Sequence, residues 1–236
     1  MFSLQTVLDV FLSILTVVPG TLGLAFLIMV LGIALGAVFA LIRIYKVRIL
    51  NRITVVYISF MRGTPQIVQL YIAYYALPEI IASIGNFFGA KIDPNNVTPI
   101  IAVIVSFTLC LSAYQAENIR GALASVEFGQ MEASYSIGLT TFQAFKRIIF
   151  PQALIVAIPN FCNSYISTIK NLSLAFTVSV VDILAKAKLE SALNFRYIES
   201  YIAAALVYWI LCFILIRVFS KVEKNLRKGR DEAFAR

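Results

Sequence analysis

The chain has 236 residues, of which 60% are hydrophobic and 14% charged, and its formal net charge is +8. This composition is too apolar for a soluble domain of this length, which excludes an ordinary cytoplasmic enzyme. In so apolar a chain, the surplus of positive charge is a signal of membrane topology before it is a sign of nucleic-acid binding.

Long uncharged stretches predict five transmembrane helices, at residues 10–42, 53–78, 94–116, 148–169 and 200–216. A helix needs about 20 apolar residues to cross the hydrocarbon core. Only Arg62 interrupts the second stretch, and the short last stretch is flanked by aromatic residues suited to the membrane interface. No repeat or linker divides the chain. We therefore expect an all-α integral membrane protein with a single transmembrane domain over residues 1–236.

The first stretch carries two further indications. No basic residue precedes it and it is long, so we expect a retained span and not a cleaved signal peptide. It also contains Gly32 and Gly36, four residues apart. Such a pair either allows close helix packing or is ordinary membrane glycine, and the pattern leaves both interpretations open.

Basic residues predict the orientation of the helices. Five crossings place the termini on opposite sides, and basic residues gather on the cytoplasmic side. One set of connections holds fourteen of the 20 Lys and Arg residues, and the other holds four. We therefore expect an outer amino terminus, a cytoplasmic carboxyl terminus and no nucleic-acid binding. The richer set comprises Arg43, Lys46, Arg48, Arg52, Arg120, Lys146, Arg147, Arg217, Lys221, Lys224, Arg227, Lys228, Arg230 and Arg236.

Two polar connections are expected on the outer side. Residues 79–98 are rich in Gly, Asn and Pro, which predicts a loop with room for a short interfacial helix. Residues 182–198 alternate charged and apolar side chains, which predicts a helix lying at the outer surface. Neither is long enough to form a receptor domain, so capture of a solute would require another polypeptide.

The longest cytoplasmic connection, residues 117–147, predicts a helix-turn-helix. Gly138 divides it into two arms, and Pro151 is expected to close the segment. Thr140 followed by Gln143 has the pattern of a capping box at the start of the second arm. The apolar residues of that arm share one face. This face can lie across the membrane surface, meet a partner or pack beneath its own bundle, and the pattern does not decide between these.

The sequence offers few residues that could bind a metal or a cofactor. The chain has no histidine, and its three cysteines lie apart within apolar stretches. We therefore expect no metal site, no disulfide framework and no cofactor in this chain. We also find no nucleophile–base pair of the kind that a membrane enzyme would need.

The cytoplasmic loop resembles the EAA loop of the membrane subunits of ABC importers. Glu132, Ala133 and Ser134, followed by Gly138, match the Glu-Ala-Ala pattern and its glycine, except that Ser134 replaces the second alanine. Further motifs of this sequence resemble those of the permease subunits of polar amino-acid ABC importers, of the histidine, glutamine, arginine and cystine type. These matches are residues 62–65 with Gln69, residues 113–121 and residues 170–174, and the stretch 170–182 is most similar to cystine-type permeases.

The resemblance implies the type I ABC importer permease fold, in a bacterial cytoplasmic membrane. It also implies three partners, which are a second permease subunit (a copy or a paralogue), an external solute-binding protein and two ATPase subunits. ATP and Mg would be bound by the ATPase, because this chain has no Gly-x-x-x-x-Gly-Lys-Ser/Thr motif. The implied function is ATP-driven import of a polar amino acid, cystine or another neutral one.

A stand-alone secondary amino-acid carrier is the alternative function. Such a carrier would need acidic coupling groups within its spans. The intramembrane charges that stand out here, Arg62 and Lys170, are both basic, and inverted repeats are not evident. The permease interpretation is therefore favoured.

Four residues of the EAA-like loop are candidates for coupling to the ATPase: Glu132, Ala133, Ser134 and Gly138. In this hypothesis the loop acts as a stiff lever. Gly138 supplies the sharp turn, and Glu132 accepts hydrogen bonds from backbone amides at the start of the second arm. A solvated surface acid is the simpler interpretation of Glu132.

Six residues are candidates for substrate binding. Arg62 and Thr64 lie just before Pro65, which is expected to break the helix. Lys170 and Ser173 lie at a similar polar break, and at such breaks unpaired backbone groups can bind a ligand. Each of the two basic side chains can instead snorkel to the headgroups. The last two candidates are Asn163 and Ser164. Similar permeases for cationic amino acids carry an acid at the position of Ser164, so its hydroxyl favours a neutral polar substrate.

Overall fold

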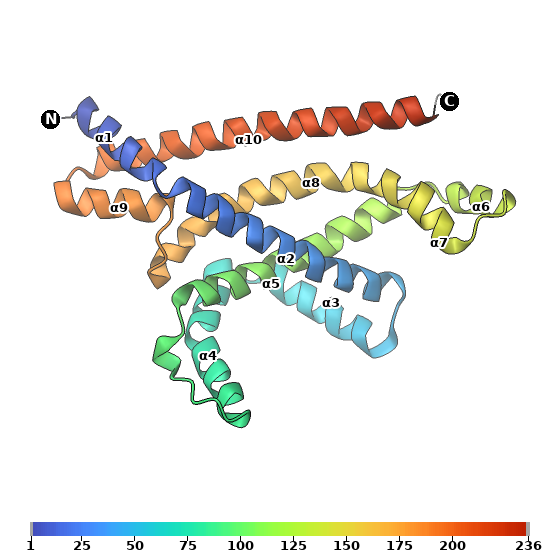
Figure 1. Cartoon of the computed structure of the whole chain (residues 1–236), viewed down its shortest axis with the longest axis horizontal. Helices are drawn as coiled ribbons and strands as arrows, with labels where there is room; N and C mark the ends of the chain where they lie inside the picture. The colour runs from blue at the N-terminus through green and yellow to red at the C-terminus, as the bar shows by residue number, and fades with distance from the viewer. Residues whose placement is uncertain (1, 235–236) are drawn as a thin grey trace.

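The computed structural model describes the backbone of residues 2–234 and the side chains of residues 2–226. Within these residues the regular elements are helices (Figure 1), and no strand is present. Four basic residues of the predicted cytoplasmic set therefore lie wholly or by their side chains outside the described part: Arg227, Lys228, Arg230 and Arg236.

Five helical segments of the described chain are long and apolar enough to cross a membrane, which confirms the predicted number. They are α2 (Val18–Ile44), α4 (Gln66–Phe87), α5 (Pro99–Ala124), a composite helix (Thr141–Val178) and the apolar part of α10 (Tyr197–Phe234). The composite helix joins α7 (Thr141–Ala144), the π-helical turn η2 (Phe145–Ile149), α8 (Phe150–Asn171) and the 3-10 helix η3 (Leu172–Val178).

The predicted start of the first span, residues 10–42, is wrong, because this stretch contains parts of two separate helices. The helix α1 (Leu4–Leu15) ends before α2 begins at Val18. Pro19 gives the reason, since its ring would clash with the carbonyl four residues earlier in a continuous helix. In the first turn of α2 the missing N–H of Pro19 costs nothing. The helix α1 packs instead against α9 (Ile183–Asn194) and α10.

The second predicted span, residues 53–78, is also two helices. The helix α3 (Arg48–Gly63) ends at Thr64, whose extended backbone is the conformation that a following proline favours. The helix α4 starts at Gln66 in a different direction (Figure 1). The predicted break at this proline is thus confirmed, and the single span is wrong.

The connection predicted at residues 79–98 is shorter than expected. The helix α4 continues through Pro78 to Phe87, because one lost hydrogen bond does not end a helix whose remaining backbone groups stay paired. Asp93 caps the short 3-10 helix η1 (Pro94–Asn96), and α5 follows from Pro99. The third span accordingly starts later and ends later than residues 94–116.

The helices α2 and α5 form the most extensive helix pair of the bundle. A Cβ atom added to Gly36 would lie 2.8 Å from the Cβ of Gln115 and 2.9 Å from the carbonyl oxygen of Ser112. One added to Gly32 would lie 3.0 Å from the Leu111 side chain. Of the two interpretations of this glycine pair, close helix packing is therefore confirmed. Small residues let two backbones approach where hydrocarbon surrounds them.

The helix predicted over residues 182–198 is confirmed as α9, but it does not lie free on a surface. Its face bearing Ile183 and Ala187 is buried against α1 and α10. At its start the buried carboxylate of Asp182 accepts hydrogen bonds from the Ala185 backbone N–H and the Tyr208 hydroxyl, both at 2.9 Å. Burial raises the pKa of this carboxyl although both hydrogen bonds lower it.

One further contact ties α1 to α9. The Ser13 hydroxyl donates to Glu190 Oε1 at 2.5 Å, and Lys186 Nζ lies 3.0 Å from the same oxygen. These two donors lower the pKa of the Glu190 carboxyl. The amino-terminal helix is thus bound to this end of the bundle by both apolar packing and polar contacts.

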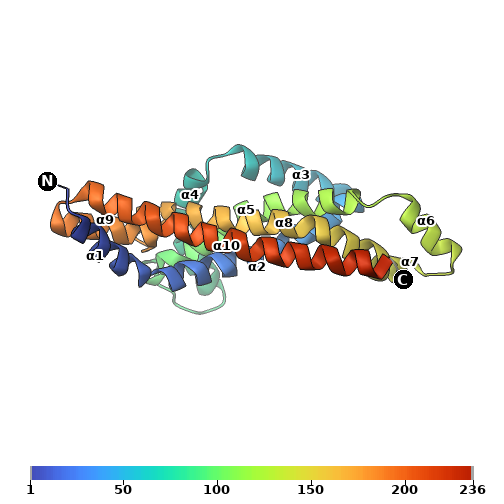
Figure 2. The same cartoon turned by 90° about the horizontal axis from the view of Figure 1, so that it is seen from above.

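The start of α1 and the end of α10 lie at opposite ends of the molecule (Figures 1 and 2). The start of α1 lies beside α9, and the end of α10 lies toward α6 (Gly129–Ser136) and α7. The turn between α2 and α3 is directed toward this second end (Figure 1). The connections that carry most of the basic residues therefore gather at one end of the bundle.

The close approach of α2 and α5 predicts a large effect of a single methyl group. We expect Gly36→Ala to lower the free energy of unfolding by about 1–3 kcal/mol, because the methyl group would overlap backbone atoms of α5. Gly23→Ala is the matched control, since a Cβ at Gly23 meets no atom within 4 Å. Denaturant unfolding in detergent followed by circular dichroism would measure both, and equal stability of the two variants would contradict close packing.

Candidate functional site

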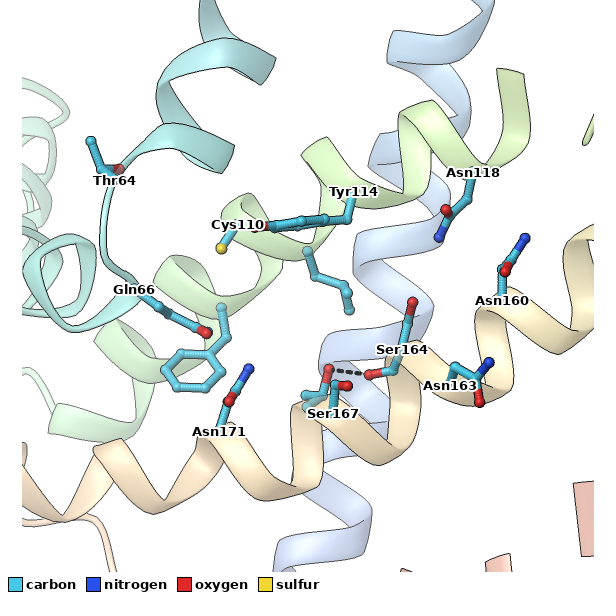
Figure 3. A pocket seen from close by; sticks show the side chains of 13 residues that line it. Thr64, Gln66, Cys110, Tyr114, Asn118, Asn160, Asn163, Ser164, Ser167 and Asn171 are labelled. Carbon is cyan, nitrogen blue, oxygen red and sulfur yellow. Dashed lines mark hydrogen bonds between the residues drawn. The ribbon is translucent and has the colours of Figure 1, made fainter. Parts of the chain in front are cut away.

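A polar cavity of about 450 Å³ lies between α5, α8 and the break that separates α3 from α4. Figure 3 shows that its labelled side chains come from these three segments. The lining combines amides, hydroxyls, a thiol and an aromatic ring, and none of its side chains carries a full charge at neutral pH. The lining residues are Thr64, Gln66, Phe107, Cys110, Leu111, Tyr114, Asn118, Asn160, Asn163, Ser164, Ser167, Thr168 and Asn171.

The wall of the cavity from α8 is a polar stripe along an otherwise apolar helix. Its six polar residues follow one another at helical spacing and therefore share one face. The Thr168 hydroxyl donates to the Ser164 backbone carbonyl at 2.9 Å, so this side chain is anchored to its own helix. The other polar groups of the stripe keep donors and acceptors for a solute or water.

The break between α3 and α4 is braced by one buried side chain. The amide Nε2 of Gln69 donates to the Met61 carbonyl at 2.9 Å, to the Thr64 carbonyl at 3.2 Å and to the Thr64 hydroxyl at 2.8 Å. The last carbonyls of a helix have no partners within it. Gln69 supplies donors to this end of α3 and holds Thr64 at the edge of the cavity.

A cluster of charges adjoins the cavity at Tyr114. The guanidinium of Arg62 lies 5.4 Å from the centre of the Tyr114 ring, a cation–π contact. One turn further along α5, Glu117 pairs with Arg43 of α2 and, at 2.7 Å, with Arg120. The cluster thus connects α2, α3 and α5 beside the cavity.

Half of the predicted substrate-binding residues line this cavity, namely Thr64, Asn163 and Ser164. Arg62 does not line it but contacts Tyr114, which does. Lys170 is exposed and lies outside the lining, and Ser173 lies in η3 beyond the end of α8. Arg62 and Lys170 were predicted as isolated charges and Ser173 as part of a polar break, whereas the face of the helix decides which side chains reach the cavity. The roles of all six residues stay predictions.

Eight polar lining residues are not among the predicted ones, although two sequence patterns point to most of them. Polar residues recur every three or four positions along α8, and a row at intervals of four runs along α5. Such rows in apolar helices indicate an inward-facing polar surface. The missed residues are Gln66, Cys110, Tyr114, Asn118, Asn160, Ser167, Thr168 and Asn171.

The cytoplasmic loop has the predicted turn between two helical arms. Gly138 adopts a positive φ of 79°, and its N–H donates to the Tyr135 carbonyl at 2.9 Å. The Leu139 N–H donates to the Ser134 carbonyl at 3.0 Å, which completes a Schellman motif at the end of α6. The predicted break at Gly138 is confirmed, because this backbone conformation favours glycine.

The start of the second arm is held by the predicted capping box and not by Glu132. The Gln143 side chain accepts from the Thr140 N–H at 3.0 Å, and the Thr140 hydroxyl accepts from the Gln143 N–H at 3.3 Å. The carboxylate of Glu132 is exposed and forms no hydrogen bond within the described residues. The expectation that Glu132 bonds these amides is therefore wrong. Of its neighbours, Ala133 is exposed and Ser134 is buried, with its hydroxyl donating to the Gln130 carbonyl.

The second arm does not end at Pro151, as the sequence suggested. It continues from Thr141 through η2 into α8 as one composite helix. In η2 the Phe150 N–H donates to the Phe145 carbonyl, five residues earlier. This wider turn lies directly before Pro151, whose ring would otherwise crowd the carbonyl four residues back. The helix can therefore pass the proline without breaking.

Three apolar side chains of the loop project from the protein. Phe128, Ile137 and Phe142 are between 72% and 93% exposed. Ile149, in contrast, is buried beneath the bundle. The apolar surface of the loop is thus divided: one part packs on the bundle, and the other part stays exposed among the residues that the structure describes.

Comparison with known proteins gives concordant results. Residues 29–228 match the profile of the family described as "Binding-protein-dependent transport system inner membrane component". A probable amino-acid ABC transporter permease protein of Vibrio harveyi is 42% identical over 201 residues, which cover 85% of this chain and 86% of the relative. An L-cystine transport system permease protein of Bacillus subtilis is 38% identical over 229 residues, covering 97% and 93%.

The fold has a counterpart among solved structures. A chain from the crystal structure of an amino acid ABC transporter with histidines superposes with a TM-score of 0.80 at 26% identity. The match covers 95% of this chain and 99% of that one. The helical arrangement therefore agrees along nearly the whole length of both chains.

The brace at the helix break can be tested by removing its donors. We expect Gln69→Leu to lower the free energy of unfolding by about 1–3 kcal/mol, because the end of α3 would lose its hydrogen bonds inside the protein. Gln66→Leu is the matched control, since this side chain forms no hydrogen bond within the described residues. Chemical unfolding of both detergent-solubilised variants is the measurement. A control as unstable as Gln69→Leu would show that the brace contributes nothing specific.

Proposed function

This chain belongs to the family of binding-protein-dependent transport system inner membrane components, and on that premise we propose how its cavity and its loop perform transport. It is the permease subunit of an amino-acid ABC importer, and it carries a polar amino acid across the bacterial cytoplasmic membrane. The similarity to amino-acid permeases over almost the full chain supports this assignment. It is a transport subunit and not an enzyme.

The cavity between α5 and α8 is the proposed path and binding site of the substrate. The first N–H groups of α4 have no partner within the helix, and Gln66 at its start lines the cavity. The positive end of this helix favours a carboxylate. The amides of the α8 stripe have both donors and acceptors, so they suit an ammonium group and polar side chains.

The uncharged lining supports a neutral polar substrate. A cationic or anionic side chain would lose its hydration in the cavity without meeting an opposite charge. Cystine, which the name of the Bacillus subtilis relative specifies, has the required chemistry, with amino-acid groups at both ends and no net charge. We therefore propose cystine or another neutral polar amino acid as the substrate.

The loop around Gly138 is the proposed contact with an ATPase subunit. Its exposed Phe128, Ile137 and Phe142 leave an apolar surface for a partner. The composite helix then runs without interruption from Thr141 to Asn171, roughly 45 Å, and carries the polar stripe at its far half. A displacement at the loop would therefore move the cavity wall as a rigid body. In this proposal Glu132, Ala133 and Ser134 belong to the docking surface.

The remaining partners follow from the same proposal. Two ATPase subunits bind ATP and Mg, a solute-binding protein delivers the substrate outside, and a second copy or a paralogue completes the permease. The chain forms a single permease domain, with its amino terminus outside and its carboxyl terminus in the cytoplasm. The basic connections at one end of the bundle support this orientation.

The neutral lining predicts a change of specificity. We expect Ser164→Glu to raise uptake of arginine or lysine relative to cystine by about tenfold, because the new carboxylate would pair with the cationic side chain. Ser83→Glu is the matched control, since Ser83 is exposed near the end of α4 and lies outside the cavity lining. Competition uptake in cells that express each variant measures the ratio. An unchanged ratio for Ser164→Glu, or an equal change in the control, would remove Ser164 from the binding site.

The lever predicts a loss of coupling when the loop turn is altered. We expect Gly138→Asp to reach the membrane but to lose most substrate-stimulated ATP hydrolysis, because the turn at positive φ would be strained. Gly89→Asp introduces the same residue at a φ of 82° in the connection between α4 and α5, and it should retain stimulation. Hydrolysis is measured in vesicles that contain the chain with its ATPase and solute-binding protein.

The same vesicles test the function as a whole. Vesicles that contain only this chain should not accumulate amino acids, with or without ATP. Accumulation driven by an ion gradient in these vesicles would identify a secondary carrier instead. Normal stimulation of the Gly138→Asp variant would contradict the lever while leaving the permease assignment intact.

A further inference from the structure

The turn from α2 to α3 exposes three basic side chains around a shallow hollow. Lys46, Arg48 and Arg52, here called the basic corner, line a hollow of about 490 Å³ together with Ile49 and Asn51. All three basic side chains are exposed, and none forms an ion pair within the described residues. Asn51 adds an amide that can donate to an anion.

Glu117, the acidic residue that pairs with Arg43 near this end of α2, does not neutralise the charges of the basic corner. Glu117 is already paired with Arg43 and Arg120. Three positive charges therefore converge on the hollow without a negative partner in the described part of the chain. Such a cluster attracts an anion, and several charges acting together attract it more strongly than one.

An apolar stripe begins at the same hollow. Ile49, Ile53, Val56 and Phe60 follow one another at intervals of three or four residues, so they share one face of α3. Each is more than half exposed. The opposite face, with buried Ile58, packs against Ala113 and Ala116 of α5. The helix is thus fixed on one side and presents a free apolar stripe on the other.

The length of α3 matches one leaflet of a bilayer. From Arg52 to the helix end at Gly63 there are 11 residues, which rise roughly 16 Å. This is about half of the hydrocarbon thickness of roughly 30 Å. With the basic corner at headgroup level, the break at Thr64 lies near the middle of the membrane and the apolar stripe extends along the acyl chains of one leaflet.

We propose that the basic corner binds the headgroup of an anionic phospholipid, whose acyl chains lie along the stripe of Ile53, Val56 and Phe60. A soluble phosphate would use the charges but not the adjoining stripe. An acidic protein surface would likewise leave the stripe uncovered. An amphiphile with a negative headgroup uses both features. The proposal depends on the membrane location of α3 and not on the identity of the transported amino acid.

The headgroup contact is tested by charge removal with a matched control. The full-length chain is purified with its co-purifying subunits, and bound phosphatidylglycerol and phosphatidylcholine are counted by native mass spectrometry. Each basic side chain near a membrane surface contributes about fivefold to the binding of anionic lipid. We therefore expect the double variant Arg48→Gln/Arg52→Gln to weaken retention of phosphatidylglycerol by about 25-fold, without an effect on phosphatidylcholine. Lys221→Gln/Lys224→Gln on α10 removes the same charge from exposed positions and should retain the lipid.

The acyl-chain contact needs a second measurement. Phosphatidylglycerol with a photoactivatable acyl chain should label the α3 peptide that contains Ile53, Val56 and Phe60, and the Arg48/Arg52 variant should lose this label. Circular dichroism verifies that the variant remains folded.

Four results would overturn the proposal. Two concern lipid binding: the α10 control loses as much phosphatidylglycerol as the Arg48/Arg52 variant, or the chain binds soluble glycerol phosphate as tightly as the lipid. The other two are photolabelling confined to helices other than α3, and an Arg48/Arg52 variant that loses the ATPase subunits while its lipid retention is unchanged. The last result would identify the corner as a protein-docking surface. None of these results depends on transport activity, so they leave the permease assignment unaffected.

Discussion

The need of backbone groups in a bilayer for hydrogen-bond partners within the protein shapes the centre of this structure. Hydrocarbon offers no hydrogen bonds, so each break in a helix needs internal partners. At the break between α3 and α4, the amide of Gln69 supplies them. The polar stripe of α8 turns toward a cavity for the same reason. A feature that would be costly toward lipid thereby becomes the proposed binding site.

Close packing between α2 and α5 provides the frame in which this site is held. Gly36 brings the backbone of α2 almost into contact with α5, and the charge cluster around Glu117 binds the two helices again further along. Because α5 also forms one wall of the cavity, the position of Tyr114 depends on the α2 contact. In the proposed mechanism, α8 is the wall that is displaced against this side.

The composite helix gives such a displacement a direct route. Its first turn belongs to the cytoplasmic loop and its far half to the cavity, with a π-helical turn in between that lets it pass Pro151. A continuous helix can carry a displacement from the loop to the cavity wall. Together with the exposed apolar side chains of the loop, this continuity supports the proposed coupling to an ATPase subunit.

The amino-acid sequence by itself determined the features that depend on composition and on neighbouring residues. The number of spans follows from hydropathy, the turn at Gly138 from its freedom at positive φ, and the capping box from Thr140 and Gln143. Tertiary structure decided the rest, because packing and helical faces are not local properties. It showed that α9 is buried against α1 and α10, that Gln143 and not Glu132 holds the second arm, and that Asn163 lines the cavity while Lys170 does not. Neighbouring positions on one helix can face different surroundings, and only the arrangement of the other helices determines which of them meets the cavity.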